Sequence, residues 1–284
     1  MNSKLLVLGT MAYDAIETPF GKTGKILGGC ATYIGLAASH FKSECGLISI
    51  IGSDFEEEHL ALLKAKNLDL TGVEQLEGEK TFFWSGKYQN DLNTRTTLDT
   101  QLNVLTKFNP KVPANFKDAS VVLLGNLDPN LQLEVLDQMD KKPDLVIMDT
   151  MNFWIESYRE KLDELIGRVD VISIKDEEAR QLTQKHSLVE AAKDLQAMGP
   201  KYVVIKKGEH GALLFNGNEI FCAPGLPLEE VFDPTGAGDS FIGGFAAYLL
   251  ERKKITFEDM KTAVIVGSAL ASFTVQEFGT SALE

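Results

Sequence analysis

The chain has 284 residues, of which 44% are hydrophobic and 24% charged, values typical of a globular protein with one large core. Its formal net charge of −13 argues against non-specific nucleic-acid binding and against docking on an anionic membrane surface. Three cysteines without metal-ligand spacing, and no apolar run approaching ~20 residues, favour a reduced, cytoplasmic protein without a membrane span.

The N-terminal part begins with a short apolar run over residues 4–9 that predicts a buried strand closed by glycine. Asp14 follows in the exit loop, where open α/β sheets place ligand contacts, although an isolated loop aspartate is often a turn residue. The Gly28-Gly29 pair precedes a segment of small residues and allows a ligand or another backbone to come close. Tyr33 in that segment either stacks on a ligand ring or belongs to the core.

An aromatic stretch interrupts the α/β pattern after a strand expected at 45–51 and a helix expected at 56–66. Residues 81–88 predict a strand, and residues 92–98 pair back on it after a turn at 89–91. Such an insertion suits a β-sheet lid that covers a substrate and excludes water. A dimer face or a local core explains the same pattern.

From residue 120 onward, apolar strands alternate with helical stretches, which indicates a parallel sheet covered by helices. Strands are expected at 121–124, 145–148, 169–174 and 202–205. Two polar segments follow strand ends, at 149–152 and 175–178, where side chains should face the crevice of the sheet. Acidic residues that open a helix explain 175–178 equally simply.

The most informative run is Asp233-Pro234-Thr235-Gly236-Ala237-Gly238-Asp239-Ser240-Phe241, which closes a turn and opens a helix. The free N–H groups at the start of that helix form an anion site, and Asp239 lies beside it. A carboxylate beside an anion site makes sense in phosphoryl transfer, where it accepts the proton of the attacking alcohol. An ordinary carboxylate in a first helical turn is the alternative.

The same run resembles the signature of the ribokinase-like (PfkB) family of carbohydrate and nucleoside kinases, D-x-x-G-A-G-D followed by a small hydroxyl residue and Phe. The resemblance implies that Asp239 is the catalytic base and that the backbone of Gly236, Ala237 and Gly238 forms the anion hole. It also implies that Thr235 belongs to the ATP site. Asp233 corresponds to a residue that commonly helps to hold a monovalent cation, which makes K⁺ a candidate ion.

On the acceptor side, the resemblance implies that Asp14, Gly28 and Gly29 hold the substrate hydroxyls. Tyr33 stands where the family often has Asn, and it is counted with these residues. Cys30 stands where some sugar kinases carry Lys, so the contacts of ribokinase itself are not carried over. From the lid, Arg95 is expected to reach the substrate.

On the nucleotide side, the stretch from Lys206 to Ala212 resembles the family's Gly-x-x-Gly turn, with Gly208 and Gly211 close to ATP. Glu178 matches a glutamate that acts on Mg²⁺, commonly through water. Lys175 replaces the Asn of that motif, and our hypothesis is that its ammonium contacts an ATP phosphate.

The resemblance therefore predicts one kinase domain over residues 1–284, an α/β/α sandwich of three layers with a mostly parallel, Rossmann-type sheet. A discontinuous β-lid should come from about 12–27 and 80–100, and it is also a candidate homodimer interface. The expected reaction is transfer of the γ-phosphoryl group of ATP, with Mg²⁺, to a hydroxyl of a sugar or sugar-like compound. A nucleoside or an inositol is the alternative acceptor, and a catalytically inactive regulatory protein that binds a nucleotide or metabolite is the alternative of another class.

Overall fold

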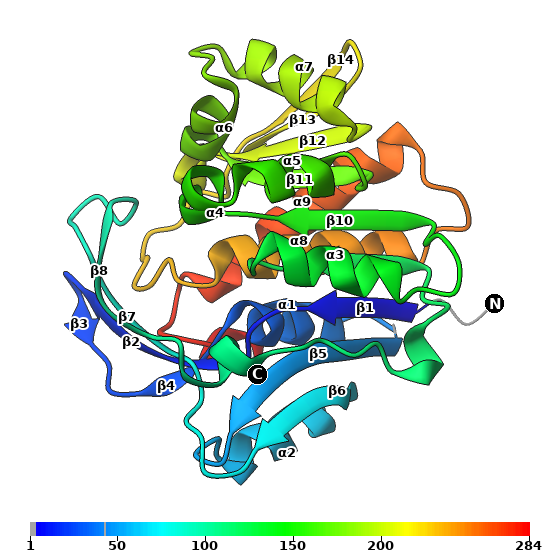
Figure 1. Ribbon diagram of the computed structural model, residues 1–284. Coiled ribbons are helices and arrows are strands. Elements are labelled where there is room, and N and C mark those ends of the chain that lie inside the picture. Colours follow the sequence, from blue (N-terminus) through cyan, green and yellow to red (C-terminus); the bar gives the residue numbers. More distant parts are fainter. Residues whose placement is uncertain (1–3, 43) are drawn as a thin grey trace.

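The computed structural model describes residues 4–42 and 44–284, and within them the chain forms one large and one small sheet (Figure 1). The large sheet is built from β1 (Lys4–Leu8), β5 (Glu44–Gly52), β6 (Leu68–Leu76), β9 (Val121–Leu124), β10 (Leu145–Asp149), β11 (Val171–Lys175), β12 (Tyr202–Lys206), β13 (Ala212–Asn216) and β14 (Glu219–Ala223). Their order is β14-β13-β12-β11-β10-β9-β1-β5-β6, and only the pairs that involve β13 are antiparallel. The predicted mostly parallel sheet is confirmed.

Helices cover both faces of this sheet. One face carries α1 (Cys30–Ser39), α2 (Glu57–Ala65), α8 (Ala237–Leu250) and α9 (Phe257–Thr274); the other carries α3 (Pro129–Asp137), α4 (Asn152–Ser157), α5 (Arg159–Ile166), α6 (Asp176–Thr183) and α7 (Leu188–Met198). In β1, Leu5 and Val7 join the first core, whereas Leu6 and Leu8 join the second. Burial on both faces explains why the central strands read as unbroken apolar runs.

The helix that begins at the signature packs closely against its two neighbours. A Cβ added to Gly243 would lie 2.6 Å from the carbonyl oxygen of Ile34 in α1, and one added to Gly244 would lie 3.0 Å from Leu270 in α9. The missing side chains thus let the helices approach, which offsets the poor helix propensity of glycine. This packing fixes the position of the N-terminus of α8.

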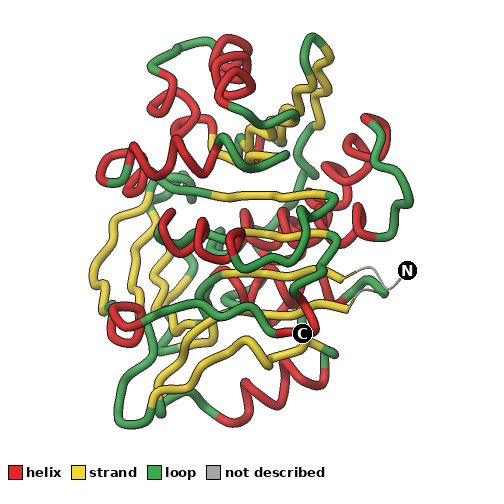
Figure 2. The backbone as a smooth tube through the Cα atoms, turned by 45° about the vertical axis from the view of Figure 1, so that its right-hand side comes forward, coloured by secondary structure: helices red, strands yellow, loops and turns green. Residues whose placement is uncertain are grey.

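The small sheet is the predicted lid. It consists of β2 (Ala12–Thr18), β3 (Gly21–Lys22), β4 (Ile26–Gly28), β7 (Phe83–Tyr88) and β8 (Arg95–Gln101), with the order β3-β2-β7-β8 and β4 beside β2. Figure 1 shows it to the left, the side toward which β1 points, and Figure 2 shows the same lid in a turned view.

The predicted start of one lid strand was wrong, and two edge strands were not predicted. The returning lid strand begins at Arg95, not at residue 92, because Leu92 has a φ of +53° and the Asp91 carboxylate accepts the N–H groups of Asn93 and Thr94. These contacts extend the turn at the expense of the strand. No strand was predicted at β6 or β14, two edge strands with exposed residues.

The topology locates the crevice. From β1 the chain builds β5 and β6 on one side and then β9 to β14 on the other, so the strand order reverses between β1 and β9. Ligands of open α/β sheets bind outside the carboxyl ends of the strands at such a point. The lid strands β2 and β4, which follow β1 in the chain, stand over this edge (Figure 1).

Candidate active site

The loop before α8 presents unpaired backbone donors. Gly236 is the N-cap, with a left-handed φ of +77°, and it directs the chain into the helix. The N–H groups of Gly236, Gly238 and Asp239 have no hydrogen-bond partner among the described residues, whereas Ala237 N–H donates to Pro234 O at 3.3 Å. The open donors at a helix N-terminus can bind an anion.

The ring of Tyr33, in α1, packs against this loop at Gly236. A Cβ on Gly236 would collide with that ring, and Tyr33 is only 1% exposed. Its hydroxyl is buried without a hydrogen-bond partner among the described residues. Burial, and next the Asp14 and Asp233 carboxylates, raises the pKa of Tyr33 well above its usual value. A buried, unpaired hydroxyl among carboxylates is a polar group that a ligand could satisfy.

Asp14 lies within strand β2 of the lid and not, as predicted, in a loop after the first strand, and it is 5% exposed. A Cβ on Gly28 of β4 would collide with its carboxylate, so the glycine makes room for that group. Gly29, with a φ of +93°, donates its N–H to Asp14. Burial, and next the nearby Asp233, raises the pKa of Asp14 to about 7. The structure therefore brings Asp14, Gly28 and Gly29 together, close to Tyr33.

The charged centre of the crevice is an ion pair between two strand ends. Lys206 Nζ, at the end of β12, lies 2.7 Å from Asp149 Oδ2, at the end of β10, and both side chains are at most 12% exposed. Burial lowers the pKa of Lys206, but the Asp149 carboxylate outweighs it and the net shift is upward. A Cβ on Gly238 would lie 3.2 Å from Lys206 Nζ, so the ammonium lies against the loop with the open donors.

Glu178 and Lys175 lie beside this pair. Glu178 is buried in α6, and its Oε2 accepts the N–H of Lys175 at 2.9 Å, so it also caps its helix. Burial, and next Asp149, raises the pKa of Glu178. Lys175 is exposed, yet loss of hydration and then the Arg95 cation lower its pKa. Both explanations of 175–178 thus apply to Glu178, which caps a helix and faces the charged centre.

Asp239, in the first turn of α8, has the environment expected of a proton acceptor. Loss of hydration, and next the Asp149 carboxylate, raises its pKa to about 7, while Lys206 acts in the opposite direction. No side chain donates a hydrogen bond to its carboxylate among the described residues. A carboxylate with such a pKa can take a proton near neutral pH and return it readily.

The lid reaches the same crevice through two residues of paired strands. Tyr88 is buried, and its hydroxyl accepts a hydrogen bond from Thr235 Oγ1 at 3.2 Å, which links the lid to the signature loop. Arg95, paired with Tyr88 in the ladder, is close enough to lower the pKa values of Asp14 and Asp239. The guanidinium therefore lies where it can meet a ligand held by either carboxylate.

The Gly-x-x-Gly turn follows β12. Gly208 (φ +54°) and Gly211 (φ +83°) both need left-handed backbone, and Lys207 N–H closes the turn on Gly211 O at 2.8 Å. A Cβ on Gly208 would lie 2.8 Å from Asn93 Oδ1, at the tip of the lid. The turn thus lies beside the lid and one residue beyond Lys206.

Asp233 is fully buried and organises the signature loop. Its Oδ1 accepts Thr235 N–H at 2.8 Å, and its Oδ2 accepts Gly279 N–H at 3.0 Å. The carboxylate thereby joins the loop to the C-terminal segment. Burial raises its pKa, and these two backbone hydrogen bonds oppose the rise.

The donor set suits Mg²⁺ bound with a phosphate group. Glu178 has an oxygen without a partner among the described residues, and the Asp149 carboxylate lies near it. Mg²⁺ prefers oxygen ligands and keeps several waters when it accompanies phosphates. A separate group of possible metal ligands, formed by Glu56, Glu58 and His59, lies near the start of α2 in a different part of the fold.

The sequence missed two residues of this site. Asp149 was only part of a polar strand end, and its position at the end of β10 was the available signal. Tyr88 was only an aromatic residue of the lid, although its place on the same face as Trp84 was visible in the period-two pattern.

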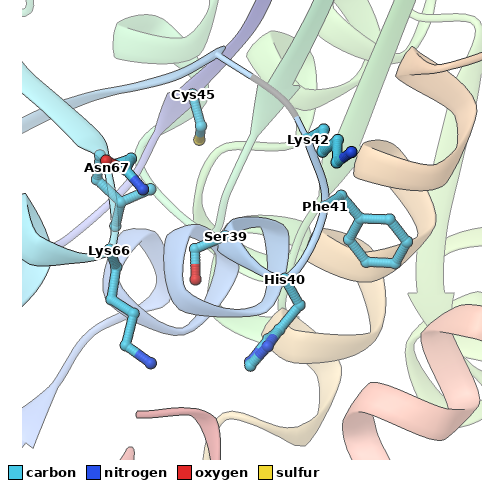
Figure 3. Close-up of a pocket in the computed structure, with 8 residues that line it drawn as sticks. Ser39, His40, Phe41, Lys42, Cys45, Lys66 and Asn67 are labelled. Carbon is cyan, nitrogen blue, oxygen red and sulfur yellow. The ribbon is translucent and has the colours of Figure 1, made fainter.

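The cavity in Figure 3 is a separate feature. It has a volume of about 340 Å³ and is lined by residues 39–42, 45 and 66–68, which lie before or at the start of β5 and β6. Figure 3 shows the side chains of His40 and Lys66 pointing to the same side. Because it lies at the amino ends of these strands, it is at the opposite edge of the sheet from the crevice.

In the described part of the chain, the helices lack the length and apolar character needed to cross a membrane.

The model of the pfkB family of carbohydrate kinases matches residues 2–284. The chain is 32% identical over 249 residues to a cytidine kinase of Thermococcus kodakarensis, which covers 86% of this chain and 87% of the relative. It is 26% identical to a nucleoside kinase of Methanothermobacter thermautotrophicus, over 97% of this chain and 90% of the relative. The crystal structure of the Methanocaldococcus jannaschii nucleoside kinase superposes with a TM-score of 0.79 at 20% identity, covering 98% of this chain and 93% of that one.

Proposed function

The chain belongs to the pfkB family of carbohydrate kinases and is an ATP-dependent phosphotransferase with an alcohol acceptor, and we propose that this acceptor is a nucleoside and that Asp239 is the catalytic base. The chemistry rests on one observation. The Asp239 carboxylate, with a pKa of about 7 and no hydrogen-bond donor among the described residues, lies beside the open N–H groups of Gly238 and Asp239.

In the proposed reaction, Asp239 takes the proton of the acceptor hydroxyl as its oxygen bonds to the γ-phosphorus. The bond between that phosphorus and the bridging β–γ oxygen breaks, and ADP leaves with the electron pair. The N–H groups of Gly236 and Gly238 stabilise the negative oxygens of the moving phosphoryl group, together with the expected donor Ala237. Ala237 contributes less unless its weak bond to Pro234 opens on binding.

Lysines supply the positive charge in this proposal. Lys206 lies against Gly238, so its ammonium can meet the transferred phosphoryl group while Asp149 keeps it in place. Lys175 contacts the ATP phosphates from the next strand end. ATP and Mg²⁺ are typical of the family, and here Mg²⁺ would neutralise phosphate charge within reach of Glu178, through water. Thr235 and the turn at Gly208 and Gly211 complete the nucleotide side.

Asp14 holds the acceptor by accepting hydrogen bonds from two ribose hydroxyls, next to the backbone of Gly28 and Gly29. The unpaired hydroxyl of Tyr33 is a further partner for such a group, and Arg95 approaches from the lid. A free sugar satisfies the same hydroxyl contacts, so these residues alone do not choose between the expected acceptors. The names of the two relatives, a cytidine kinase and a nucleoside kinase, favour the nucleoside.

A panel of acceptors tests the proposal. Purified protein with Mg·ATP is assayed on cytidine, uridine, adenosine, ribose, fructose and myo-inositol, and products are identified by mass spectrometry and NMR. We expect a nucleoside to give the highest kcat/KM and a nucleoside monophosphate as product. Preferential turnover of a free sugar or of inositol would overturn the nucleoside assignment and leave the kinase chemistry intact.

Asp239→Asn tests the base. The variant should lose at least ~100-fold in kcat, the usual minimum for a general base, and should still bind ATP. Near-normal turnover would remove Asp239 from this role. The intact base and donors also argue against a regulatory protein that only binds metabolites, since binding needs no base.

Lys175→Asn restores the residue expected from the family motif. If Lys175 contacts ATP phosphate, the KM for ATP should rise and its salt dependence should weaken. An unchanged KM and salt dependence would contradict the contact.

Three further proposals concern the surroundings of the site. Asp233 lies between the signature loop and Gly279, which supports a K⁺ ion nearby; replacing K⁺ with Na⁺ should then lower kcat. The exposed strand β8 lies at an edge of the lid and supports a homodimer through the lid, to be measured by light scattering. The three cysteines are unpaired, which supports a reducing cytoplasmic location.

A further inference from the structure

One face of the lid looks into the crevice. Asp14 of β2 is in register with Trp84 of β7, and Tyr88 of β7 is in register with Arg95 of β8. Residues in register, and residues two apart on a strand, point to the same face of a sheet. Since Asp14 and Tyr88 contact the site, Trp84 and Arg95 share this inner face.

Trp84 has no part in either hydrophobic core among the described residues, although it is a large apolar side chain. The preceding residue, Phe83, points to the opposite face and packs against the first core. Phe83, rather than Trp84, therefore packs β7 on the body of the protein. The indole is left partly exposed beside Asp14, where the acceptor is expected.

The indole is held in one orientation. It lies against Gly86, since a Cβ at that position would collide with the ring, and its Nε1 donates to Thr97 Oγ1 at 3.3 Å. The guanidinium carbon of Arg95 lies over the ring, 5.5 Å from its centroid. A ring fixed by a glycine and a hydrogen bond has little rotamer freedom left to lose on binding.

We propose that Trp84 is the platform on which the nucleobase of the acceptor stacks, with Arg95 above the opposite side of the base. This inference rests on the proposed nucleoside acceptor and names the residue that selects it. Two van der Waals contacts of ~3.5 Å need about 7 Å between indole and guanidinium. The present 5.5 Å therefore requires Arg95 to move outward slightly, which an exposed arginine on an edge strand allows.

The arrangement separates the candidate acceptors by their chemistry. Asp14 recognises hydroxyls, which ribose, inositol and nucleosides all carry. The indole adds a face-to-face contact that suits the planar base of a nucleoside better than the puckered ring of a sugar or of inositol. A base stacked on an aromatic side chain should bind about five- to 150-fold more tightly than the same compound at a site without that side chain.

Fluorescence provides a direct test, because the chain has two tryptophans, Trp84 and Trp154. In the Trp154→Phe variant, Trp84 is the only tryptophan, and excitation beyond the absorption band of the six tyrosines selects its emission. Titration with cytidine should quench its emission to saturation, whereas ribose should leave the emission unchanged. No change of emission at a cytidine concentration that saturates turnover would overturn the proposal.

Kinetics of Trp84→Leu and Trp84→Phe complete the test. Leu should raise the KM for cytidine about five- to 150-fold with the KM for ATP unchanged, and Phe should restore much of the loss. Trp154→Leu is the matched control and should leave the KM for cytidine unchanged. If cytidine is phosphorylated and Trp84→Leu keeps its KM within twofold, stacking is wrong although the nucleoside assignment holds. If the panel selects a free sugar instead, the nucleoside assignment itself fails.

Discussion

Asp149 and Lys206 act on the pKa of Asp239 in opposite directions, which gives a prediction with two signs. Asp149 raises that pKa and Lys206 lowers it. Asp149→Asn should therefore move the acidic limb of kcat/KM to lower pH, and Lys206→Met should move it to higher pH. The prediction concerns the direction in which the pH profile shifts, whatever amount of activity each variant loses.

The wild-type limb sets the scale of the measurement. With a pKa of about 7 for Asp239, half of the base is ionised at pH 7 and roughly a tenth at pH 6. Activity should fall about fivefold over that unit of pH. Asp14, with a pKa of about 7, steepens the same limb. Because burial and Asp233 are the main causes of that raised pKa, the shift of the limb between the two variants reports on Asp239.

The assay is initial velocity between pH 5.5 and 9 at constant ionic strength, on wild type, both single variants and the double variant. Removing one partner of a buried ion pair costs ~3–5 kcal/mol of stability, so each variant is first checked by circular dichroism and thermal melting. The double variant removes both charges and should return the limb toward that of the wild type. If both single variants move the limb in the same direction, or not at all, the assignment of Asp239 as the titrating base is refuted.

Other substitutions test the geometry around this centre. The raised pKa of Asp239 means that the folded state loses stability as pH rises from about 4 through 7, so Asp239→Asn should melt a few degrees higher than wild type at pH 8; an equal or lower melting temperature would contradict this. Gly236→Ala combines a left-handed φ with a collision against Tyr33, so kcat should fall at least tenfold, and the added change Tyr33→Leu should recover part of it; full activity of the single variant would show that the loop tolerates a side chain. Gly28→Ala pushes the Asp14 carboxylate aside, so the KM for the acceptor should rise at least tenfold while that for ATP stays constant, and a rise confined to ATP would place Asp14 wrongly.

The features that could be predicted from the sequence are those formed by residues close together in the chain. The turn, the open donors and the carboxylate of residues 233–241 lie within nine consecutive residues, so their chemistry could be recognised before their surroundings were known. The alternation of apolar runs with helical stretches similarly indicated a covered parallel sheet, because both faces of each central strand are buried.

The remaining features depend on contacts between distant segments. Asp149 and Lys206 are 57 positions apart, and only the parallel neighbours β10, β11 and β12 bring them together. The left-handed Leu92 was invisible because leucine rarely adopts that backbone, and the Asp91 carboxylate that stabilises the turn competes with strand formation. The edge strands β6 and β14 lack an unbroken apolar run because part of each faces water.

The hydrogen bond from Gly279 to Asp233 bears on how the protein matures during translation. The carboxylate that shapes the signature loop has one of its two backbone donors 46 positions further along the chain. During synthesis, every strand of both sheets precedes Gly279, so this hydrogen bond can form only after the sheets have left the ribosome. A chain truncated just before residue 279 should therefore keep the residues of both sheets but lack one of the two backbone donors that hold Asp233.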